Sequence, residues 1–465
     1  MSYQKHHMIV PAIAGGSILC DEHISVDHDR MAGMLEELDM LFGREAAGES
    51  SCIALEVENS VRQAVLILYL LSERINFFLR APASPVHQSL PSFCDKLLSM
   101  DVGVAHERGA AAAVRISRNP EYICPGSMHP RSGRVLFSSS GTSGAPKYIC
   151  YDGESLLRNA ENCRRRFGHD EDSRVLVPVP ISHMYGMGAG FLPALIAGAS
   201  ICLVERNNVV KLYDKVKNFL PGMIFITPTV ARMMLKLGKQ LPGERTYITA
   251  GESISRDTLT QFREKFGWVI NLYGCTELGA IATTPFWRED VQLPLEPLDE
   301  VAVRLGDDGR IWCRHNAGFI GYADGTGRIS PGYLPDGWYD TRDRGYDAGK
   351  GCFSVTGRMD NCINRSGFLV SLEEIESLLE ESIEGICKAV VFEGGVGNGM
   401  ATGVIAVCEV VEGHLPDRDV VKAACRDRMN KYLVPDDFYF TSQLPRLGNG
   451  KPDRLYLINH YKNII

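Results

Sequence analysis

The sequence predicts an α/β protein. A large N-terminal domain of doubly wound, layered sheets and a β-ribbon subdomain precedes a small, mobile α+β C-terminal domain. Three observations support this class. Short apolar runs alternate with amphipathic helical segments up to residue 272. From about Asp299 the segments become short, with Gly and Asp turns typical of β-ribbons. A second series of helices and strands follows Arg358. We place the boundary at Met359–Asp360, which gives domains of residues 1–359 and 360–465.

The alternating pattern gives the elements of the large domain in order. Val61, Val65, Leu68 and Leu71 recur at helical spacing, for example, whereas the apolar runs around them are strand-length. The predicted strands are Ser51–Glu56, Asn76–Leu79, Val135–Phe137, a strand starting at Tyr148, Arg174–Val179, Ser200–Glu205, Met223–Thr227, Tyr247–Ala250 and Val269–Leu272. The predicted helices are Asp29–Phe42, Val61–Ile75, Gly186–Ala197, Val209–Phe219, Thr229–Leu237 and Ser255–Phe266. In a doubly wound sheet, ligands bind at the carboxyl ends of the strands.

The last third of the chain has a different character. The predicted ribbon segments are Val301–Leu305, Gly309–Arg314 and Cys352–Val355. In the small domain we predict helices at Leu372–Glu381 and Asp417–Leu433, strands at Cys387–Phe392 and Met400–Val411, and a polar C-terminal segment.

Composition excludes several classes of protein. Of 465 residues, 45% are hydrophobic and 23% charged, and the net charge is −8, without the basic block that nucleic acid requires. The N-terminus lacks a secretory pattern, and apolar runs such as Ala194–Val204 are too short to span a bilayer. We therefore expect a soluble, cytoplasmic protein without a membrane span. The 14 cysteines are scattered, without the two-to-four-residue spacing of zinc sites, and we interpret them as small hydrophobes.

A hydroxyl-rich loop between two predicted strands suits a polyphosphate. It runs from Leu136 to Lys147. Glycines let its backbone N–H groups form a concave anion site, and the lysine adds positive charge. A solvated Ser/Gly linker is the alternative. The residues that would bind phosphate are Ser138, Ser139, Ser140, Gly141, Thr142, Ser143, Gly144 and Lys147.

Four further stretches suit a nucleotide, and each has an ordinary structural alternative. Asn271–Glu277 offers an aromatic face for a base and a carboxylate for Mg²⁺, or it is a common Tyr-Gly bend. Asp343, within Asp336–Gly345, suits two ribose hydroxyls, or the stretch is an acidic turn. Arg358 reaches a phosphate or ribose, or is an exposed turn residue. Lys451 follows a Gly-Asn-Gly turn on a mobile loop, or lies in a solvated tail.

In their order and spacing these five motifs, from about Val135 to Arg454, resemble the AMP-forming adenylating enzymes: acyl- and aryl-CoA synthetases, adenylation domains of nonribosomal peptide synthetases, and luciferases. The resemblance implies ATP and Mg²⁺ as cofactors and a small carboxylic acid as substrate. Coenzyme A, or the phosphopantetheine of an acyl or peptidyl carrier protein, would be the thiol acceptor. The implied reaction forms an acyl-adenylate and then a thioester.

The resemblance also implies roles for individual residues. Lys451, Glu277, Thr142 and His183 would be catalytic, with Glu277 holding the metal ion. The hinge would be Asp360, and Asn364 and Gly367 would line the thiol tunnel. Besides the phosphate loop, the residues that would bind ATP or AMP are Asn271, Tyr273, Gly274, Thr276, Asp343 and Arg358.

An acyl pocket is implied by the segment Ile181–Met187 and by Gly251 and Glu252. His183 would line the acyl path, although a histidine beside apolar residues is more often a packed core residue. Amino-acid-activating members carry an aspartate in this region, and dihydroxybenzoate-type members usually an asparagine. Met184 cannot hold a buried cation, and with Tyr185 it suits an apolar or aromatic acid. We expect glycines 186, 188 and 190 to leave space nearby.

The chain departs from the family pattern at three places. Arg342 replaces a glycine before the ribose aspartate, which we expect to require a different backbone. Asn364 stands where many members have lysine, and the region before the phosphate loop is shortened. Three functions remain open: an acyl- or aryl-CoA ligase, a freestanding enzyme that loads a carrier protein in polyketide or peptide biosynthesis, and a non-catalytic nucleotide-binding scaffold. The intact catalytic positions favour an enzyme.

Overall fold

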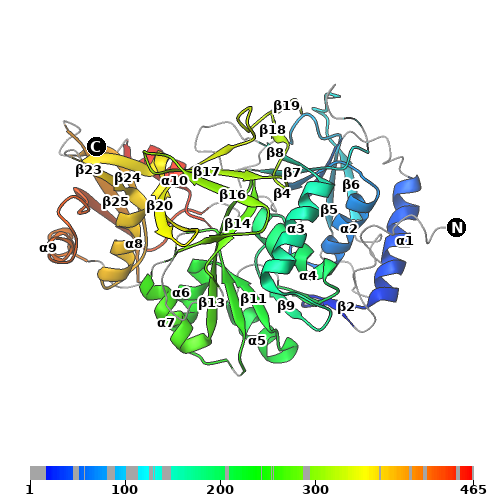
Figure 1. The fold of residues 1–465 in the computed structure, drawn as a ribbon, viewed down its shortest axis with the longest axis horizontal. Helices are drawn as coiled ribbons and strands as arrows, with labels where there is room; N and C mark the ends of the chain where they lie inside the picture. The colour runs from blue at the N-terminus through cyan, green and yellow to red at the C-terminus, as the bar shows by residue number, and fades with distance from the viewer. Residues whose placement is uncertain are drawn as a thin grey trace. The chain divides into compact units, whose positions relative to one another are not determined.

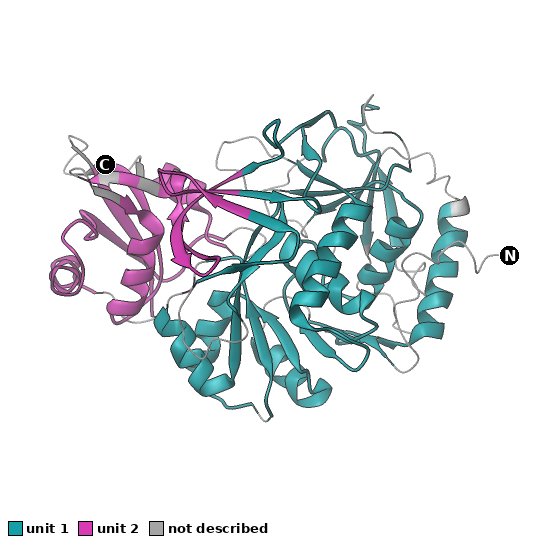
Figure 2. Cartoon of the chain, viewed as in Figure 1, with its two compact units in different colours: residues 1–252, 256–302, 313–339 teal, residues 253–255, 303–312, 340–465 magenta. Residues whose placement is uncertain are grey.

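The protein folds into two compact units. The computed structural model describes residues 17–44, 52–56, 58–80, 90–100, 114–124, 129, 131–138, 148–204, 209–241, 243–252, 254, 256–285, 294–365, 368–396, 401–411, 416–446 and 451–462. Residues 1–252, 256–302 and 313–339 form the first unit, and residues 253–255, 303–312 and 340–465 form the second (Figure 2). The predicted boundary at Met359–Asp360 marks a hinge, which a static fold does not test, so it stays a prediction.

A nine-stranded sheet forms one layer of the first unit, in the order β15-β14-β13-β12-β11-β9-β10-β1-β2. Figure 1 labels β9, β11, β13 and β14 of this sheet. Its central strands pair in parallel, and antiparallel strands extend both edges. The strands are β1 (Leu19–Cys20), β2 (Ser25–Val26), β9 (Arg174–Val177), β10 (Ser200–Leu203), β11 (Met223–Ile226), β12 (Thr246–Thr249), β13 (Trp268–Cys275), β14 (Gly279–Thr283) and β15 (Glu296–Pro297).

An eight-stranded sheet forms a second layer of the same unit, in the order β19-β18-β8-β7-β4-β3-β5-β6. Strands β5, β3, β4 and β7 are parallel, and the outer strands are antiparallel to their neighbours. The strands are β3 (Ile53–Glu56), β4 (Phe77–Arg80), β5 (Lys96–Met100), β6 (Val114–Arg118), β7 (Arg134–Ser138), β8 (Tyr148–Asp152), β18 (Gly321–Ala323) and β19 (Ile329–Ser330).

Helices cover both faces of the nine-stranded sheet. Ile224 of β11 lies in one apolar core with residues of α5, α6 and α7. Its neighbour Phe225 points to the opposite face, because successive strand side chains alternate, and packs on Phe167 of α3 at 5.7 Å between ring centroids. The doubly wound class predicted from the sequence is therefore confirmed. The helices of this unit are α1 (His28–Arg44), α2 (Val61–Ser72), α3 (Gly153–Phe167), α4 (Leu192–Ile196), α5 (Val209–Phe219), α6 (Pro228–Leu237) and α7 (Arg256–Phe266).

The predicted β-ribbon is a four-stranded sheet of β16 (Val301–Leu305), β17 (Arg310–His315), β20 (Tyr339–Gly349) and β21 (Cys352–Arg358). The α+β part of the second unit has a core shared by α8, α9 and a three-stranded sheet. Its elements are β22 (Cys362–Arg365), β23 (Phe368–Ser371), α8 (Leu372–Ser382), β24 (Ile386–Val396), β25 (Ala401–Val410), α9 (Arg418–Arg428), β26 (Asp437–Thr441) and α10 (Arg454–Lys462).

Helix α3 was not predicted, and three segments that were predicted take a different form. The helix predicted at Gly186–Ala197 begins as a π-helical turn, Tyr185–Phe191, before α4. Pro193 has no N–H to donate into that turn, which breaks the regular ladder. The helix predicted to Leu433 ends at Arg428, and the side chain of Asn430 then accepts a bond from the N–H of Tyr432 in a turn. The polar C-terminal segment contains helix α10.

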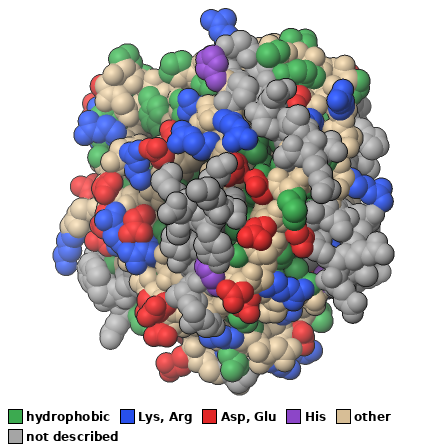
Figure 3. All heavy atoms as spheres, turned by 90° about the vertical axis from the view of Figure 1, so that its right-hand side faces the viewer, with side chains coloured by type: hydrophobic (Ala, Val, Ile, Leu, Met, Phe, Trp, Pro, Cys, Tyr) green, Lys and Arg blue, Asp and Glu red, His purple; other side chains and the backbone are tan. Residues whose placement is uncertain are grey.

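The state of the cysteines agrees with their interpretation as small hydrophobes. Every cysteine whose side chain is described is a free thiol, and most of them are buried, as small hydrophobes would be. Within the described ranges, no group of three or more His, Cys, Asp or Glu side chains could hold a metal ion. No helix of those ranges is long and apolar enough to cross a membrane. Figure 3 shows acidic and basic side chains interspersed over the face that it draws.

His169, just after α3, is buried without a hydrogen-bond partner for Nε2 among the described residues. Its side chain packs against Phe167 and Phe225, with ring centroids 5.8 and 6.5 Å away. Loss of hydration lowers the pKa of His169 from 6.5 to about 4. Between these pH values the unfolded chain binds a proton that the folded chain does not, so folding weakens as the pH falls through this window and levels off below it.

Replacing His169 with Phe should therefore reduce the loss of stability in acid. Because 2.5 pKa units separate the two states, the fall in unfolding free energy between pH 7 and pH 4 should shrink by ~3 kcal/mol. Urea unfolding across this range measures it. An equal fall for H169F and the wild type would contradict the account.

Candidate functional site

The turn after β13 presents Glu277, one of the predicted site residues, at the carboxyl end of the nine-stranded sheet. The hydroxyl of Tyr322 lies 3.0 Å from Glu277 Oε1, and the hydroxyl of Tyr339 lies 2.9 Å from that of Tyr322. A carboxylate only accepts, so Tyr322 donates to Glu277 and Tyr339 donates to Tyr322. One carboxylate oxygen is thus anchored, and the described residues supply no partner for Oε2.

Three successive carbonyl groups fix the backbone of this turn. The Tyr151 hydroxyl donates to the oxygen of Thr276 at 2.8 Å, and the N–H of Phe319 donates to that of Glu277 at 2.8 Å. His315 Nδ1 lies 3.0 Å from the oxygen of Leu278. Because a carbonyl only accepts, Nδ1 must carry the proton. The turn is therefore held by donors from three other segments of the chain.

His315 is locked as a neutral ring. With the proton on Nδ1, its Nε2 accepts a bond from the Asn162 side-chain amide at 3.2 Å. Burial lowers the pKa of His315, although its bond to Leu278 opposes the shift. Asn162 also donates to the carbonyl of Asp299 at 3.0 Å, so this network ties α3 to the turn.

An aromatic cluster of Phe319, Tyr322, Tyr333 and Tyr339 packs beside Glu277. The ring of Phe319 lies 5.0 Å from Tyr322, 5.0 Å from Tyr333 and 5.5 Å from Tyr339. Burial raises the pKa of all three tyrosines, and the negative charge of Glu277 adds to the shift. Their hydroxyls therefore keep their protons, and those of Tyr322 and Tyr339 donate the bonds described above.

An open cavity of about 860 Å³ lies on the first unit beside Phe319 and Tyr333. None of the predicted site residues lines it. Its wall consists of Asp152, Ser155, Glu300, Val301, Ala302, Arg314, His315, Asn316, Gly318, Phe319, Ile320, Tyr333, Leu334, Pro335 and Gly337.

In the second unit, Asp343 and Arg358 are brought together. They are direct partners across the antiparallel pair β20–β21, and Arg358 Nε lies 3.8 Å from Asp343 Oδ1. The aspartate side chain is 14% exposed and the arginine 49%. A mostly buried carboxylate beside a more exposed guanidinium suits the hydroxyl and phosphate groups of one nucleotide.

Arg342 bears on one expectation. We expected this arginine to require a backbone different from that of the usual glycine, and this comparison stays a prediction; the φ of Arg342 itself is +59°, in the left-handed region that glycine adopts without strain. Its N–H bonds to Asp340 Oδ1 at 2.9 Å. The exposed arginine therefore keeps a glycine-like backbone at the cost of strain from its β-carbon.

The glycines of the π-helical turn correct another expectation. They do not leave space for a substrate, because their neighbours already fill it. A β-carbon at Gly188 would lie 2.7 Å from Met184 Cε, and one at Gly186 would overlap the carbonyl of Pro180. Close packing requires these glycines.

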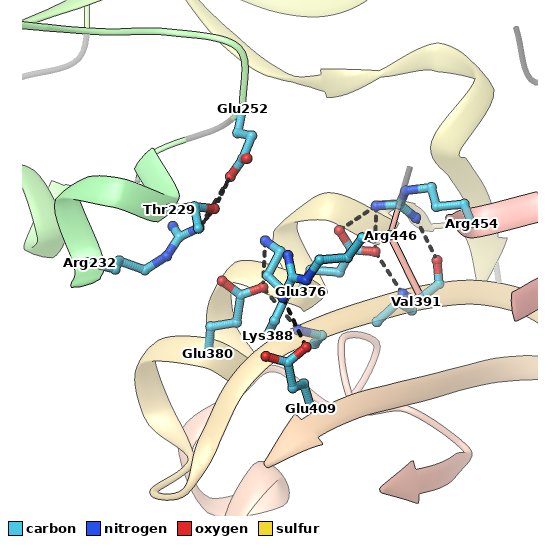
Figure 4. Close-up of polar contacts among 11 residues, drawn as sticks. Thr229, Arg232, Glu252, Glu376, Glu380, Lys388, Val391, Glu409, Arg446 and Arg454 are labelled. Carbon is cyan, nitrogen blue, oxygen red and sulfur yellow. Dashed lines mark hydrogen bonds and ion pairs between the residues drawn. The ribbon is translucent and has the colours of Figure 1, made fainter. Parts of the chain in front are cut away.

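The predicted acyl-pocket residues lie on two segments of the first unit. Met184 is buried, His183 is half-buried, and the Tyr185 hydroxyl lies 2.9 and 2.8 Å from the carbonyl oxygens of Ile226 in β11 and Ile248 in β12. Gly251 has a φ of +92° just after β12. Glu252 Oε2 accepts bonds from Thr229 at 2.8 Å and Arg232 at 3.3 Å (Figure 4), so its charge is paired.

Other predicted residues are placed only in part. Ser138 ends β7 with an exposed side chain, and Lys451 is exposed. Asn271 and Tyr273 lie half-buried on β13, Gly274 is exposed, and Thr276 is half-buried in the turn. The side chains of Asp360 and Asn364 lie outside the described residues, as do Ser139, Ser140, Gly141, Thr142, Ser143, Gly144, Lys147 and Gly367.

Sequence reasoning missed the side chains that support Glu277. Tyr322, Tyr151 and His315 lie 45, 126 and 38 residues from it in the sequence, so no local motif joins them. The Gly-Tyr pair at 321–322, which lies in β18, offered no signal by itself.

Comparisons with known proteins agree on one class. A family model described as AMP-binding enzyme matches residues 84–323, more than half of the chain. A naringenin synthase from Pestalotiopsis fici is 30% identical over 353 residues, which cover 70% of this chain but only 13% of that protein. A sulfoacetate–CoA ligase from Cupriavidus necator is 26% identical, over 71% of this chain and 68% of its own. A 3,4-dihydroxybenzoate–[aryl-carrier protein] ligase from Bacillus anthracis is 25% identical, over 70% and 73%.

Among solved structures, an anthranilate CoA ligase in complex with anthranoyl-AMP superposes with a TM-score of 0.81. The match covers 99% of this chain and 97% of that one at 16% identity. At this identity the likeness concerns the fold, and it agrees with the architecture predicted from the sequence.

The strained backbone at Arg342 gives a prediction about stability. Arg342→Gly should be more stable than Arg342→Ala by about 1 kcal/mol, because alanine retains the β-carbon that a positive φ disfavours. Both variants lose the contacts of the arginine side chain. The difference between their free energies of unfolding therefore reports the cost of a β-carbon at this backbone conformation. Urea unfolding of the two variants measures it. Greater stability of the alanine variant would show that the backbone at this position is not left-handed.

Proposed function

This chain belongs to the AMP-binding enzyme family, and from that premise we propose that it joins a carboxylic acid to a thiol with consumption of ATP. The acid is first activated as an acyl-adenylate, and the thiol then takes the acyl group to form a thioester. The observation that carries the proposal is the Glu277 turn: within the region that matches the family, it presents one anchored carboxylate on a fixed backbone.

In the first step the substrate carboxylate attacks the α-phosphorus of ATP and pyrophosphate leaves. The proposed roles follow the chemistry of the side chains. The loop Ser138–Lys147, with Thr142, grips the β- and γ-phosphates, and Asp343 binds the ribose hydroxyls. Lys451 supplies a positive charge to the substrate carboxylate and the α-phosphate. Such a reaction depends on positioning and charge neutralisation.

The residues around Glu277 fit a magnesium ion. Tyr322 occupies Oε1, so the protein offers Oε2 as a single ligand, and Mg²⁺ usually takes one or two carboxylates with water and substrate phosphates. When bound, the ion would neutralise charge on the ATP phosphates. Tyr322 and Tyr339 then act on the orientation of Glu277.

For the second step we propose a turn of the C-terminal domain about Asp360. The turn withdraws Lys451 and brings the segment Asn364–Gly367 to the thiol. Attack of the thiolate on the carbonyl carbon breaks the bond to AMP, which leaves. Alternation between two shapes lets one site carry out two reactions.

The thiol is coenzyme A if the enzyme is an acyl- or aryl-CoA ligase. It is the phosphopantetheine of a carrier protein if the enzyme loads such a protein. Relatives at similar identity include a CoA ligase and an aryl-carrier-protein ligase, so both acceptors belong in the test. For the substrate we propose a carboxylic acid whose remaining part is apolar or aromatic. Met184 and Tyr185 carry no charge, and the charge of Glu252 is already paired with Arg232.

Product analysis tests the function. The protein is incubated with ATP, Mg²⁺ and benzoic, cinnamic or fatty acids, with CoA or a holo carrier protein. AMP, pyrophosphate and the matching thioester should form together. If none of the acids releases pyrophosphate, a non-catalytic nucleotide-binding scaffold becomes the better account.

Replacing Lys451 with Ala should separate the two steps. Adenylate formation should be abolished, whereas thioester formation from a supplied acyl-adenylate should remain within about twofold, because the lysine is withdrawn in that step. The exposed Lys431→Ala should affect neither step. Equal loss of both half-reactions in K451A would contradict domain alternation.

Replacing Tyr322 with Phe should weaken binding of Mg²⁺ together with a non-hydrolysable ATP analogue about tenfold, because a hydrogen bond to a charged group is lost. Calorimetric titration at several Mg²⁺ concentrations measures this. Binding of the analogue without Mg²⁺ should change little. Tyr346→Phe, at a tyrosine 58% exposed on β20, is the control. An unchanged Mg²⁺ dependence in Y322F would count against the anchoring of Glu277.

A further inference from the structure

Helix α8 places two buried glutamates one turn apart against strand β24 (Figure 4). Glu376 Oε1 accepts a bond from the N–H of Val391 at 2.7 Å, and Glu380 Oε1 accepts one from Ala389 at 3.1 Å. Their side chains are 8% and 5% exposed. Because β24 is an edge strand of its sheet, these carboxylates satisfy N–H groups that no other strand pairs.

The two glutamates pair with cationic side chains from different parts of the chain. Glu380 pairs with Lys388 of β24 itself, at 2.9 Å. Glu376 pairs with Arg454, 78 residues away at the start of α10, through two bonds of 2.6 and 2.5 Å. Arg454 also donates to the carbonyl of Val391 at 3.2 Å. The first pair joins α8 to β24, and the second adds the C-terminal segment to them.

Lys451 lies between two residues that are tied to the core, Arg446 before it and Arg454 after it. On the preceding side, Arg446 donates to Glu409 of β25 at 2.9 Å. Arg446 also forms a β-bridge with Pro452, and the N–H of Asp453 bonds to the carbonyl of Pro445 at 2.8 Å. The residues on the two sides of Lys451 are thus bonded to each other. Each side is also tied to the core by an arginine–glutamate pair.

We propose that the Glu376–Arg454 pair is a positioning device that fixes Lys451 for adenylate formation, an inference that rests on the function proposed above. Lys451 is exposed and precedes Arg454 by three residues, a span of at most about 10 Å of chain. One terminal nitrogen of Arg454 bonds to both oxygens of Glu376 and the other bonds to the carbonyl of Val391. This guanidinium fork therefore binds helix and strand together and fixes direction as well as distance. Since a displacement of about 1 Å is enough to impair such chemistry, the base of the segment needs this anchor.

The second unit does not depend on Arg454 for the packing of α8 on β24. Ile375 and Leu379 of α8 lie in one apolar core with Ala389 and Val391 of β24. The Glu380–Lys388 pair joins the same two elements, and both of its members lie on them. It is therefore a matched control, with the same kind of ion pair on the same helix and strand.

The experiment compares two double variants, E376Q/R454M and E380Q/K388M. Glutamine keeps an acceptor for the strand N–H, and neither variant leaves a buried carboxylate without a cation. Hydrogen exchange of residues 445–456 reports the order of the segment, independently of activity. Pyrophosphate release and thioester formation from a supplied adenylate report the two half-reactions.

E376Q/R454M should exchange faster at residues 445–456 and lose roughly tenfold or more of pyrophosphate release, with thioester formation within about twofold of wild type. E380Q/K388M should match the wild type in all three. If E376Q/R454M does not fold, R454K takes its place, because lysine keeps the positive charge but lacks the guanidinium fork. R454K should lose pyrophosphate release and keep thioester formation in the same way, with a smaller loss.

Two results would overturn the inference: equal loss of pyrophosphate release in both double variants, or equal loss of both half-reactions in E376Q/R454M. Unchanged exchange at residues 445–456 would do the same. If the wild type itself releases no pyrophosphate with any acid, the proposed function fails instead, and the exchange data alone decide whether the pair orders the segment.

Discussion

The turn that carries Glu277 depends on three hydrogen bonds to successive carbonyl oxygens, from Tyr151, the N–H of Phe319 and His315. Tyr151 belongs to β8 of the eight-stranded sheet, whereas the turn follows β13 of the nine-stranded sheet. The two layers of the first unit are therefore joined at the residue proposed to hold the metal ion. A loop at a strand end is free to move unless its backbone groups are satisfied, and here donors from distant segments satisfy them.

The second unit repeats this arrangement with charges in place of neutral donors. Lys451 is exposed, yet the chain on either side of it is fixed by arginines that bind carboxylates on α8 and β25. In both units, the side chain proposed for chemistry stands on a short segment whose base is held by hydrogen bonds or ion pairs to other elements. A functional side chain keeps its geometry only when the residues behind it are themselves fixed.

Much of the fold could be predicted from sequence, because strand–helix alternation is a local pattern. The nucleotide-binding roles stay predictions, although Asp343 and Arg358, which the sequence places in separate motifs, do face each other across β20–β21. What could not be predicted depends on tertiary neighbours. Glycine 188 was interpreted as free space, but Met184 fills it. Tyr322 and His315 contact the Glu277 turn from far along the chain, and only the folded sheets bring them there.

The central claim is that a substrate carboxylate attacks the α-phosphorus of ATP at this site. Transfer of oxygen tests it most directly. An accepted acid labelled with ¹⁸O at both carboxylate positions is converted to its thioester, and the AMP and pyrophosphate are examined by mass spectrometry. The account predicts one ¹⁸O atom in AMP, because the thiol breaks the carbon–oxygen bond of the adenylate, and none in pyrophosphate. Label in inorganic phosphate with formation of ADP, or AMP without label, would contradict it.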